Sequence, residues 1–377
     1  GGGRVGEIMG SPGQIFGYLA TLAFISAAGG QATDAESWFR QAWQDAAKPR
    51  FETFVPGTVY RWEVEWGPPP SPHRAAELRK EVEGKPDHPA RQELATLERL
   101  LALGGKPPTT SYTLWWVSEN SWRLNKSDSA AEEEVARFTD VAVSARERWM
   151  HAPQQLTITS LTGTGRAEDL ASWLQSMTAD LHLLLTEGFG ISRHVPHDIE
   201  SFDASETGWT ARTLSATGIF FFSGTWSKDG GLGAVEQVEA SPAVPGQWGP
   251  MRYVFSRASS SAVVEVQTFN LPKSETSPER ISRLTAVESF EVSDMSRLTK
   301  VPEAGGDDAI RGAIRVKSIH DHRSGDIVKQ KIEEGAIVDE RTASGEAADR
   351  RWLRYLGVGT LLTLAGLLVY LRMRVRA

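Results

Sequence analysis

The sequence predicts an α+β protein, in which a curved antiparallel sheet carries helices on its concave side and a C-terminal transmembrane helix follows. Three observations lead to this fold class. Apolar and polar residues alternate strictly over residues 58–66, which is typical of a half-buried antiparallel strand. Residues 167–187 place a broad apolar face at helical spacing, ending at Gly188. Residues 355–371 carry no charge and are just long enough to span a bilayer.

The elements between the two ends follow from the same patterns. Residues 33–48 predict a helix that stops at Pro49, and residues 71–104 predict a helical hairpin inserted at the edge of the sheet, with Pro72 and Pro89 opening its helices. Residues 111–117 and 121–125 predict a β-hairpin. Further strands are expected at 136–143, 154–161, 216–226, 250–257, 262–270, 283–292 and 311–320. Serial strands with few helices indicate an α+β sheet protein.

Both ends of the chain resemble targeting segments. The apolar run 15–28 is followed by the small residues 29–32, so we expect residues 1–32 to be a signal peptide. Residues 350–377 are expected to form a transmembrane anchor with a short basic tail. Residues 33–349 would then be one exported domain, held at the inner membrane and facing the periplasm.

Composition excludes several classes of protein. The chain has 377 residues, of which 40% are hydrophobic and 24% charged, and it has no cysteine. Disulfide frameworks, cysteine-ligated zinc, iron–sulfur clusters and thiol nucleophiles are therefore excluded, as is a lipid-modified N-terminal cysteine. Residues 350–376 hold six arginines and no acid, which leaves −13 on the remainder of a chain whose total charge is −7. An acidic body argues against binding to nucleic acid.

No motif for an enzyme or a cofactor stands out. The sequence lacks the nucleophile-elbow, zinc-protease and phosphate-loop patterns, so we expect no cofactor and no enzymatic step. Two histidine clusters offer metal-ligating side chains. The first consists of His194, His197 and Asp198, and the second of His320, Asp321 and His322. Each lacks a further convergent ligand and is more simply explained as a surface turn, so no metal site is expected.

Tryptophan is the unusual component, with 13 residues. Several fall on the predicted inward faces of strands, where they would line an apolar cavity covered by the helix at 167–187. The predicted lining residues are Trp62, Trp66, Leu114, Trp116, Trp122, Trp149, Leu170, Trp173, Leu174, Met177 and Leu181. The alternative interpretation is a core that these side chains fill completely.

Three segments resemble the lipoprotein-carrier superfamily of LolA and LolB, which also includes RseB. Residues 112–124 resemble the family's hairpin of a tryptophan-bearing strand and an arginine-bearing strand. Residues 138–158 are similar to a family segment in which Asp140, Trp149, Pro153, Gln154 and Ile158 hold comparable positions, although Val141 replaces a glycine. A late element at 284–302 also resembles the family's strand, turn and proline pattern. The resemblance implies an unclosed β-barrel that holds acyl chains under helices.

These observations predict a non-enzymatic, membrane-anchored envelope protein that binds a lipid or lipoprotein acyl chain in an apolar cavity. The alternative is a signalling or scaffold protein with the same fold, which binds another envelope protein through residues 71–104. A third class, a hydrolase that uses His194, His197 or Asp198, lacks a visible nucleophile or ligand set.

Overall fold

The structure is a computed structural model that describes most of the chain between residues 33 and 345. The described residues are 33–46, 50–102, 104–129, 138–152, 154–161, 173–191, 198–215, 218–226, 233–245, 249–257, 263–302, 307–308, 312–313, 316–324, 326–342 and 344–345.

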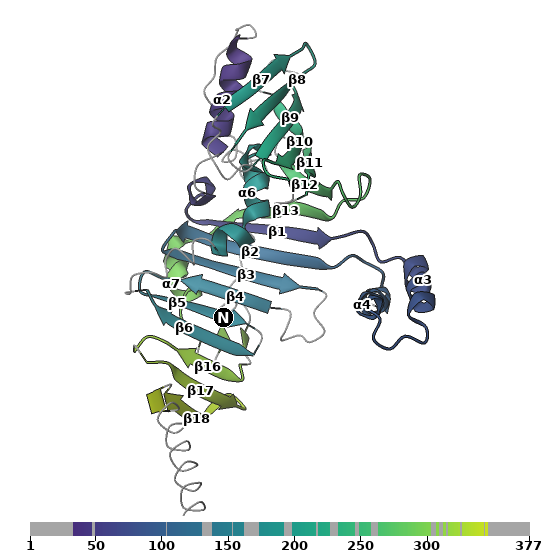
Figure 1. The fold of residues 1–377 in the computed structure, drawn as a ribbon. Coiled ribbons are helices and arrows are strands. Elements are labelled where there is room, and N and C mark those ends of the chain that lie inside the picture. The colour runs from purple at the N-terminus through teal and green to yellow at the C-terminus, as the bar shows by residue number, and fades with distance from the viewer. Residues whose placement is uncertain are drawn as a thin grey trace, which may run out of the picture.

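A single sixteen-stranded sheet dominates the fold, as Figure 1 shows. Its strand order is β18-β17-β16-β6-β5-β4-β3-β2-β1-β13-β12-β11-β10-β9-β8-β7. The strands are β1 (Thr58–Trp66), β2 (Thr109–Ser118), β3 (Ser121–Asp128), β4 (Phe138–Val143), β5 (Glu147–Ala152), β6 (Gln155–Ser160), β7 (Asp198–Ala204), β8 (Gly208–Leu214), β9 (Gly218–Thr225), β10 (Ala234–Pro242), β11 (Met251–Arg257), β12 (Val263–Asn270), β13 (Arg280–Ser289), β16 (Ser318–Asp321), β17 (Val328–Glu333) and β18 (Ala336–Thr342). Two further short strands, β14 (Asp307–Asp308) and β15 (Gly312–Ala313), pair only with each other.

The helices are short and lie at different places along this sheet. They are α2 (Thr33–Ala46), α3 (Pro72–Val82), α4 (Ala90–Ala102), α6 (Ala179–Leu185) and α7 (Met295–Leu298), with 3-10 turns η2 (Arg50–Thr53), η4 (Phe189–Ile191) and η5 (Val292–Asp294).

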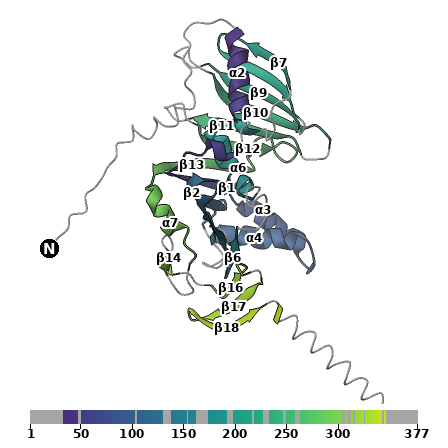
Figure 2. The ribbon, with the colours of Figure 1, turned by 90° about the vertical axis from the view of Figure 1, so that its left-hand side faces the viewer.

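Both faces of the sheet are covered, each by different helices (Figure 2). One face, here called the α6 face, packs against α2 and α6 and contains the main core cluster. The opposite face, here called the α7 face, is crossed at β3–β6 by residues 295–302, which we call the strap. Neighbouring residues of a strand point to opposite faces, so Leu124 faces α6 whereas Arg123 faces the strap.

The helical hairpin α3–α4 forms as its sequence predicts. The Ser71 hydroxyl accepts a hydrogen bond from the Arg74 backbone N–H, and Pro72 occupies the first turn of α3. The hairpin connects β1 to β2, two central strands, and projects from their ends (Figure 1). It therefore extends from the ends of two central strands.

The predicted fold class is corrected in two respects. The sheet is mixed, because β16 runs parallel to β6 after the chain crosses the α7 face. Helices lie against both faces of the sheet, because β4 and β5 carry buried or partly buried apolar residues on both of their sides. No helix among the described residues is long and apolar enough to cross a membrane. The predicted signal peptide at 1–32 and the predicted span at 355–371 both lie outside the described residues.

Candidate functional site

Most of the predicted lining residues meet in one place, the α6 face of the central strands. Six of them are almost fully buried in the main core cluster, and these are Trp62, Leu114, Trp116, Trp122, Leu174 and Leu181. Trp173 and Met177 are partly buried and pack against the same cluster. Eight of the eleven predicted residues therefore belong to this core cluster or pack against it.

Three predicted residues lie elsewhere. Trp149 is fully buried on the α7 face, where it belongs to a second cluster, because its neighbour Met150 takes the α6 face of the same strand. Trp66 lies on the α6 face but is 41% exposed at the end of β1. Leu170 lies outside the described residues.

Aromatic rings pack closely on the α6 face. Trp62 stacks on Tyr112 at 4.9 Å between ring centroids, and Trp122 stacks on Trp173 at 6.5 Å. The Trp116 ring meets Phe54 edge-on at 5.1 Å. Offset stacks and edge-to-face pairs of this kind are the favoured arrangements of aromatic side chains. This part of the face is therefore a continuous apolar surface.

The helix α2 closes the other half of the α6 face, over β7–β9. Phe39 and Trp43 are fully buried, and Phe39 lies 5.3 Å from the rings of both Trp209 and Phe222. The sequence predicted this helix but not its aromatic stripe as part of the interior. The signal was present, because Phe39 and Trp43 are separated by one helical turn.

The helix α6 lies over β12 and β13 and is joined to the sheet by two ion pairs. Near its start, Asp180 Oδ1 lies 2.9 Å from Arg280 Nη2 on β13. Past its end, Glu187 Oε2 lies 3.3 Å from Arg257 Nη1 on β11. Three leucines of this seven-residue helix, Leu181, Leu183 and Leu184, are buried, as are Asp180 and His182. Ion pairs thus hold both ends of a short cover over an apolar surface.

The helical segment is interrupted just before α6. Residues 173–177 are helical, and Thr178 then adopts φ −100° and ψ 14°, so that α6 begins at Ala179. The Thr178 hydroxyl donates to the Leu174 carbonyl at 2.7 Å, and such bonds to the preceding turn often accompany bends in helices. The predicted continuous helix at 167–187 is therefore broken at a buried threonine, and its first residues, 167–172, lie outside the described residues.

Several polar atoms are buried on the strands at and beside α6. Trp62 Nε1, Ser282 Oγ and Thr268 Oγ1 are inaccessible to solvent and have no hydrogen-bond partner within the described residues. Arg280 Nε is also inaccessible and without a hydrogen-bond partner within the described residues, although the Arg280 side chain as a whole is 25% exposed. Buried polar groups nearly always have partners in proteins, because an unpaired one costs about 1–3 kcal/mol. This group of atoms therefore needs a partner that the described residues do not supply.

Two tyrosines flank the Asp180–Arg280 pair, and their pKa values respond to it. Burial, and then repulsion by the Asp180 carboxylate, raise the pKa of Tyr112 to about 12, with Arg280 acting in the opposite direction. Burial also raises the pKa of Tyr253, an effect that Arg280 reduces. Both phenols therefore stay neutral at ordinary pH beside a charged pair.

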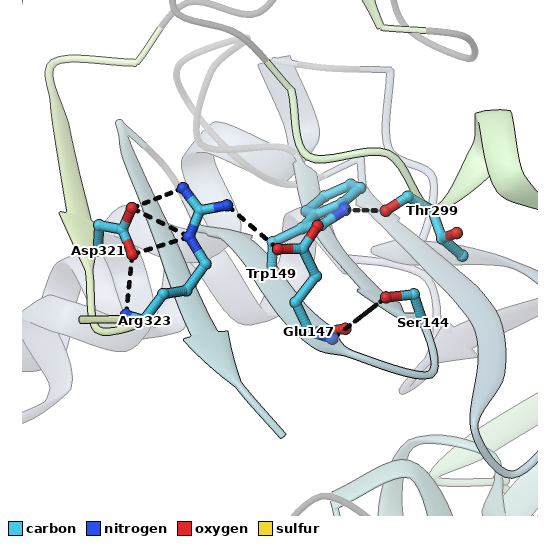
Figure 3. Close-up of polar contacts among 6 residues, drawn as sticks. All are labelled: Ser144, Glu147, Trp149, Thr299, Asp321 and Arg323. Carbon is cyan, nitrogen blue, oxygen red and sulfur yellow. Dashed lines mark hydrogen bonds and ion pairs between the residues drawn. The ribbon is translucent and has the colours of Figure 1, made fainter. Parts of the chain in front are cut away.

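The α7 face has a buried polar centre that fixes the strap. Arg123 and Asp140 are 0% and 1% exposed and form a two-pronged ion pair, with Nε to Oδ1 at 3.0 Å and Nη2 to Oδ2 at 2.5 Å. Arg123 Nη1 also donates to the Leu298 carbonyl at 2.9 Å. Trp149 Nε1 donates to the next carbonyl, that of Thr299, at 2.9 Å, as Figure 3 shows.

The residues that carry the resemblance to the lipoprotein carriers thus come together as a structural unit. Asp140 and Trp149 come from one of the similar segments, Arg123 from another, and the strap from the third. Pro153 lies outside the described residues. Their role here is to bind the strap to the sheet.

An open groove of about 600 Å³ begins where the strap leaves the sheet. Ile158, Val301, Pro302, Ile319 and Ile337 give it an apolar lining. At its rim Arg323 pairs with Asp321 at 2.7 Å and with Glu147 at 3.1 Å (Figure 3). The hydrogen bonds from Arg323 lower the pKa of Asp321. None of the predicted lining residues borders this groove.

The structure describes only part of the two histidine clusters. His194 and His197 lie outside the described residues, and Asp198 is exposed at the start of the edge strand β7. Asp321 is engaged by Arg323, and His320 Nδ1 lies 3.2 Å from Gln155 Nε2. No group of three metal-ligating side chains occurs among the residues that the structure describes.

Comparison with known proteins adds little to this geometry. No protein family matches the sequence, and no curated protein matches it. A DUF1329 family protein from Desulfovibrio piger has a similar solved structure, with 11% identity and a TM-score of 0.32, over 68% of this chain and 96% of that one. A TM-score this low supports no argument about fold or function, so the function of this protein has to be inferred from the geometry of the site.

Proposed function

We propose that this protein is a non-enzymatic binding protein that takes a lipid or lipoprotein acyl chain between α6 and the sheet. One observation carries the proposal: a short, interrupted helix covers a continuous apolar surface and is held at each end by an ion pair. Such a cover can separate from the sheet by breaking two ion pairs and the apolar contacts of its three buried leucines. The Asp180–Arg280 pair is mostly buried, so its loss on opening is costly and has to be offset by the ligand.

The surface beneath α6 suits a hydrocarbon chain. Most of the side-chain surface here is apolar, and it belongs to Trp62, Leu114 and Trp122. Each methylene moved from water into such a surface contributes about 0.8 kcal/mol, so an acyl chain of ordinary length would gain enough to offset the opening of α6. The apolar run at residues 15–28 further supports the proposal that the domain works in the periplasm.

The test is photo-crosslinking of the full chain with a palmitic acid analogue that carries a diazirine on its alkyl tail. We expect labelled peptides from residues 112–124 and 173–185, and we expect unlabelled palmitate to compete with the label. Mass spectrometry of a denaturing extract of the same preparation should also show a co-purified lipid. Labelling confined to the groove at Val301 and Ile337, or no competable labelling, would overturn the proposal.

A matched pair of variants controls for nonspecific binding of the probe. Trp122 and Trp149 are both almost fully buried, but they lie on opposite faces of the sheet. Trp122→Phe should change the affinity for the alkyl probe, because it alters the surface under the helix. Trp149→Phe should leave that affinity within twofold, because Trp149 contacts the strap on the opposite face of the sheet. Equal effects of the two substitutions would contradict the proposed location.

A second candidate function is the binding of another protein through the insertion at residues 71–104. The supporting observation is that α3 and α4 pack mainly against each other and leave an open groove of about 590 Å³ against Pro68–Pro70. A photo-crosslinking amino acid at Thr96, which lines this groove, should capture one defined partner in cells. The same residue placed at the exposed Arg341 should not, and indiscriminate capture at both sites would count against this function.

A further inference from the structure

The most informative feature beyond the apolar surface is the row of polar groups that runs beside and beneath α6. On the α6 face of β13, Arg280 pairs across the strands with Trp66 on β1 and with Thr268 on β12. Ser282 follows two residues later, between Val64 and Val266. Residues two apart on a strand point to the same face, so these groups form consecutive rows on one surface.

The row has a solvent end and an interior end. At the solvent end Trp66 is 41% exposed, its Nε1 donates to Thr110 at 2.9 Å, and the Arg280 guanidinium lies 5.7 Å from its ring. At the interior end Trp62 is fully buried. A ligand lying along these rows would therefore place its polar end at Arg280 and its chain toward Trp62 and Leu114.

The atoms that lack partners along this row can all donate a hydrogen bond. Trp62 Nε1 and Arg280 Nε can only donate, and the hydroxyls of Ser282 and Thr268 can donate. No acceptor among the described residues satisfies them. The missing partner is thus an acceptor, and the fixed positive charge of Arg280 favours a negatively charged one.

Asp180 already supplies a carboxylate to this arginine. Its Oδ1 lies 2.9 Å from Arg280 Nη2, with only 11% of the Asp180 side chain exposed. The carboxylate comes from α6, the element that must move for a ligand to enter. When α6 leaves, Arg280 would lose its counter-ion in a mostly buried position, which is costly unless another anion takes that place.

We propose that the site selects acyl ligands with an anionic head group, a carboxylate or a phosphate, and that Asp180 occupies the place of this head group in the free protein. Binding is then an exchange: the head group replaces the Asp180 carboxylate at Arg280, and its oxygens accept from Thr268 and Ser282. This inference rests on the function proposed above and adds the charge of the ligand to it.

The experiment measures dissociation constants of the full chain for three ligands with the same number of carbon atoms, by competition with the diazirine probe. These ligands are palmitate, hexadecyl phosphate and hexadecanol. We expect the two anions to bind roughly ten- to a hundredfold more tightly than the alcohol, which is the usual strength of hydrogen bonds to a charged group. Dipalmitoyl phosphatidic acid, compared with palmitate, then distinguishes a membrane phospholipid from a free fatty acid as the source of the anion.

Substitutions at Arg280 and at Asp180 test separately the binding of the anion and the competition by the carboxylate. Arg280→Gln should abolish the preference for anions and leave the affinity for hexadecanol within a few fold. Asp180→Asn removes the competing carboxylate, so it should tighten palmitate binding several-fold more than hexadecanol binding. If Arg280→Gln retains the full preference for anions, or if Asp180→Asn strengthens both ligands equally, the inference is wrong.

The second ion pair of the helix provides the matched control. Glu187→Gln also frees one end of the helical cover, but it does so at Arg257 on β11, at the opposite end from Arg280. It should change the affinities for all three ligands by the same factor, and a selective effect on the anions would contradict the placement of the head group. Failure of all three ligands to bind the unaltered chain would instead overturn the proposed function itself.

Discussion

The Arg123 guanidinium lies 4.9 Å from the centre of the Trp149 ring, and these two side chains donate to successive carbonyls of the strap, those of Leu298 and Thr299. A cation against the face of an indole gains electrostatic energy, most of all where water is excluded. The pair therefore joins two strands to the strap through one buried polar centre.

Loss of the Asp140 carboxylate should destabilise the protein strongly. Asp140→Asn leaves the fully buried Arg123 without its counter-ion, so we expect the free energy of unfolding to fall by about 3–5 kcal/mol. Urea unfolding measures this change. As a control, Glu288→Gln, which removes an exposed partner of Arg61, should cost no more than about 1 kcal/mol. Similar losses in the two variants would show that the buried centre has no special role.

The phenol of Tyr112 should make stability depend on pH in the alkaline range. Its pKa rises from 10.0 in the unfolded chain to about 12 in the folded one, so the folded state retains a proton that the unfolded state loses. The resulting stabilisation is fully present below pH 10 and disappears as the pH rises toward 12. Urea unfolding at several pH values should show this decline, and in Tyr112→Phe the decline should be smaller.

The same phenol reports on the neighbouring ion pair. Because the Asp180 carboxylate contributes to the raised pKa of Tyr112, Asp180→Asn should lower that pKa. The absorbance of tyrosinate, as the difference between each protein and its Tyr112→Phe form, measures the shift. An unchanged pKa would place the two groups too far apart to interact.

A methyl group at Gly188 should disturb the junction after α6. Gly188 has φ +93°, and a Cβ there would lie 2.8 Å from the Phe255 ring. Gly84 also has a positive φ, +71°, but a Cβ there meets nothing within 4 Å. We expect Gly84→Ala to cost about 1–2 kcal/mol for its backbone alone, and Gly188→Ala to cost about 1–3 kcal/mol more for the clash. Equal losses in urea unfolding would mean that Phe255 moves aside freely.

The α3–α4 hairpin should unfold independently of the sheet. Leu78 is fully buried, and its helix packs mainly against α4, so Leu78→Ala should weaken the hairpin by about 2–5 kcal/mol. Amide hydrogen exchange should show protection lost over residues 72–102 and retained in β1 and β2. The matched substitution Leu114→Ala, in the central sheet, should lower protection across many strands. Loss of protection in the sheet of Leu78→Ala would argue that the hairpin supports it.

Alternation of residue types predicted the strands well where one face of the sheet is polar. In β1 the apolar residues face α6 and the charged residues face solvent, so the period of two is plain in the sequence. It could not show that Trp66 is exposed, because strand alternation says nothing about where the covering helix ends.

The pattern failed where both faces are buried or where a bulge interrupts the period. In β5 Trp149 and Met150 are adjacent and pack on opposite faces, so the sequence could not assign Trp149 to a side. β10 was missed, and its register shifts between Val235 and Gln237, which breaks the alternation. The Asp180–Arg280 pair joins residues far apart in the sequence, and no local pattern connects them.

The pairing of β1 with β13 also governs how the chain can assemble during synthesis. Arg61 and Glu288 contact each other across this pair although they lie 227 positions apart. At about 5–20 residues per second, the ribosome needs roughly ten to forty seconds to deliver β13 after β1. Until then β1 lacks the strand that covers this edge, and open strand edges pair readily with other chains. Charged side chains on an open edge disfavour such pairing, and β1 carries Arg61, Glu63 and Glu65.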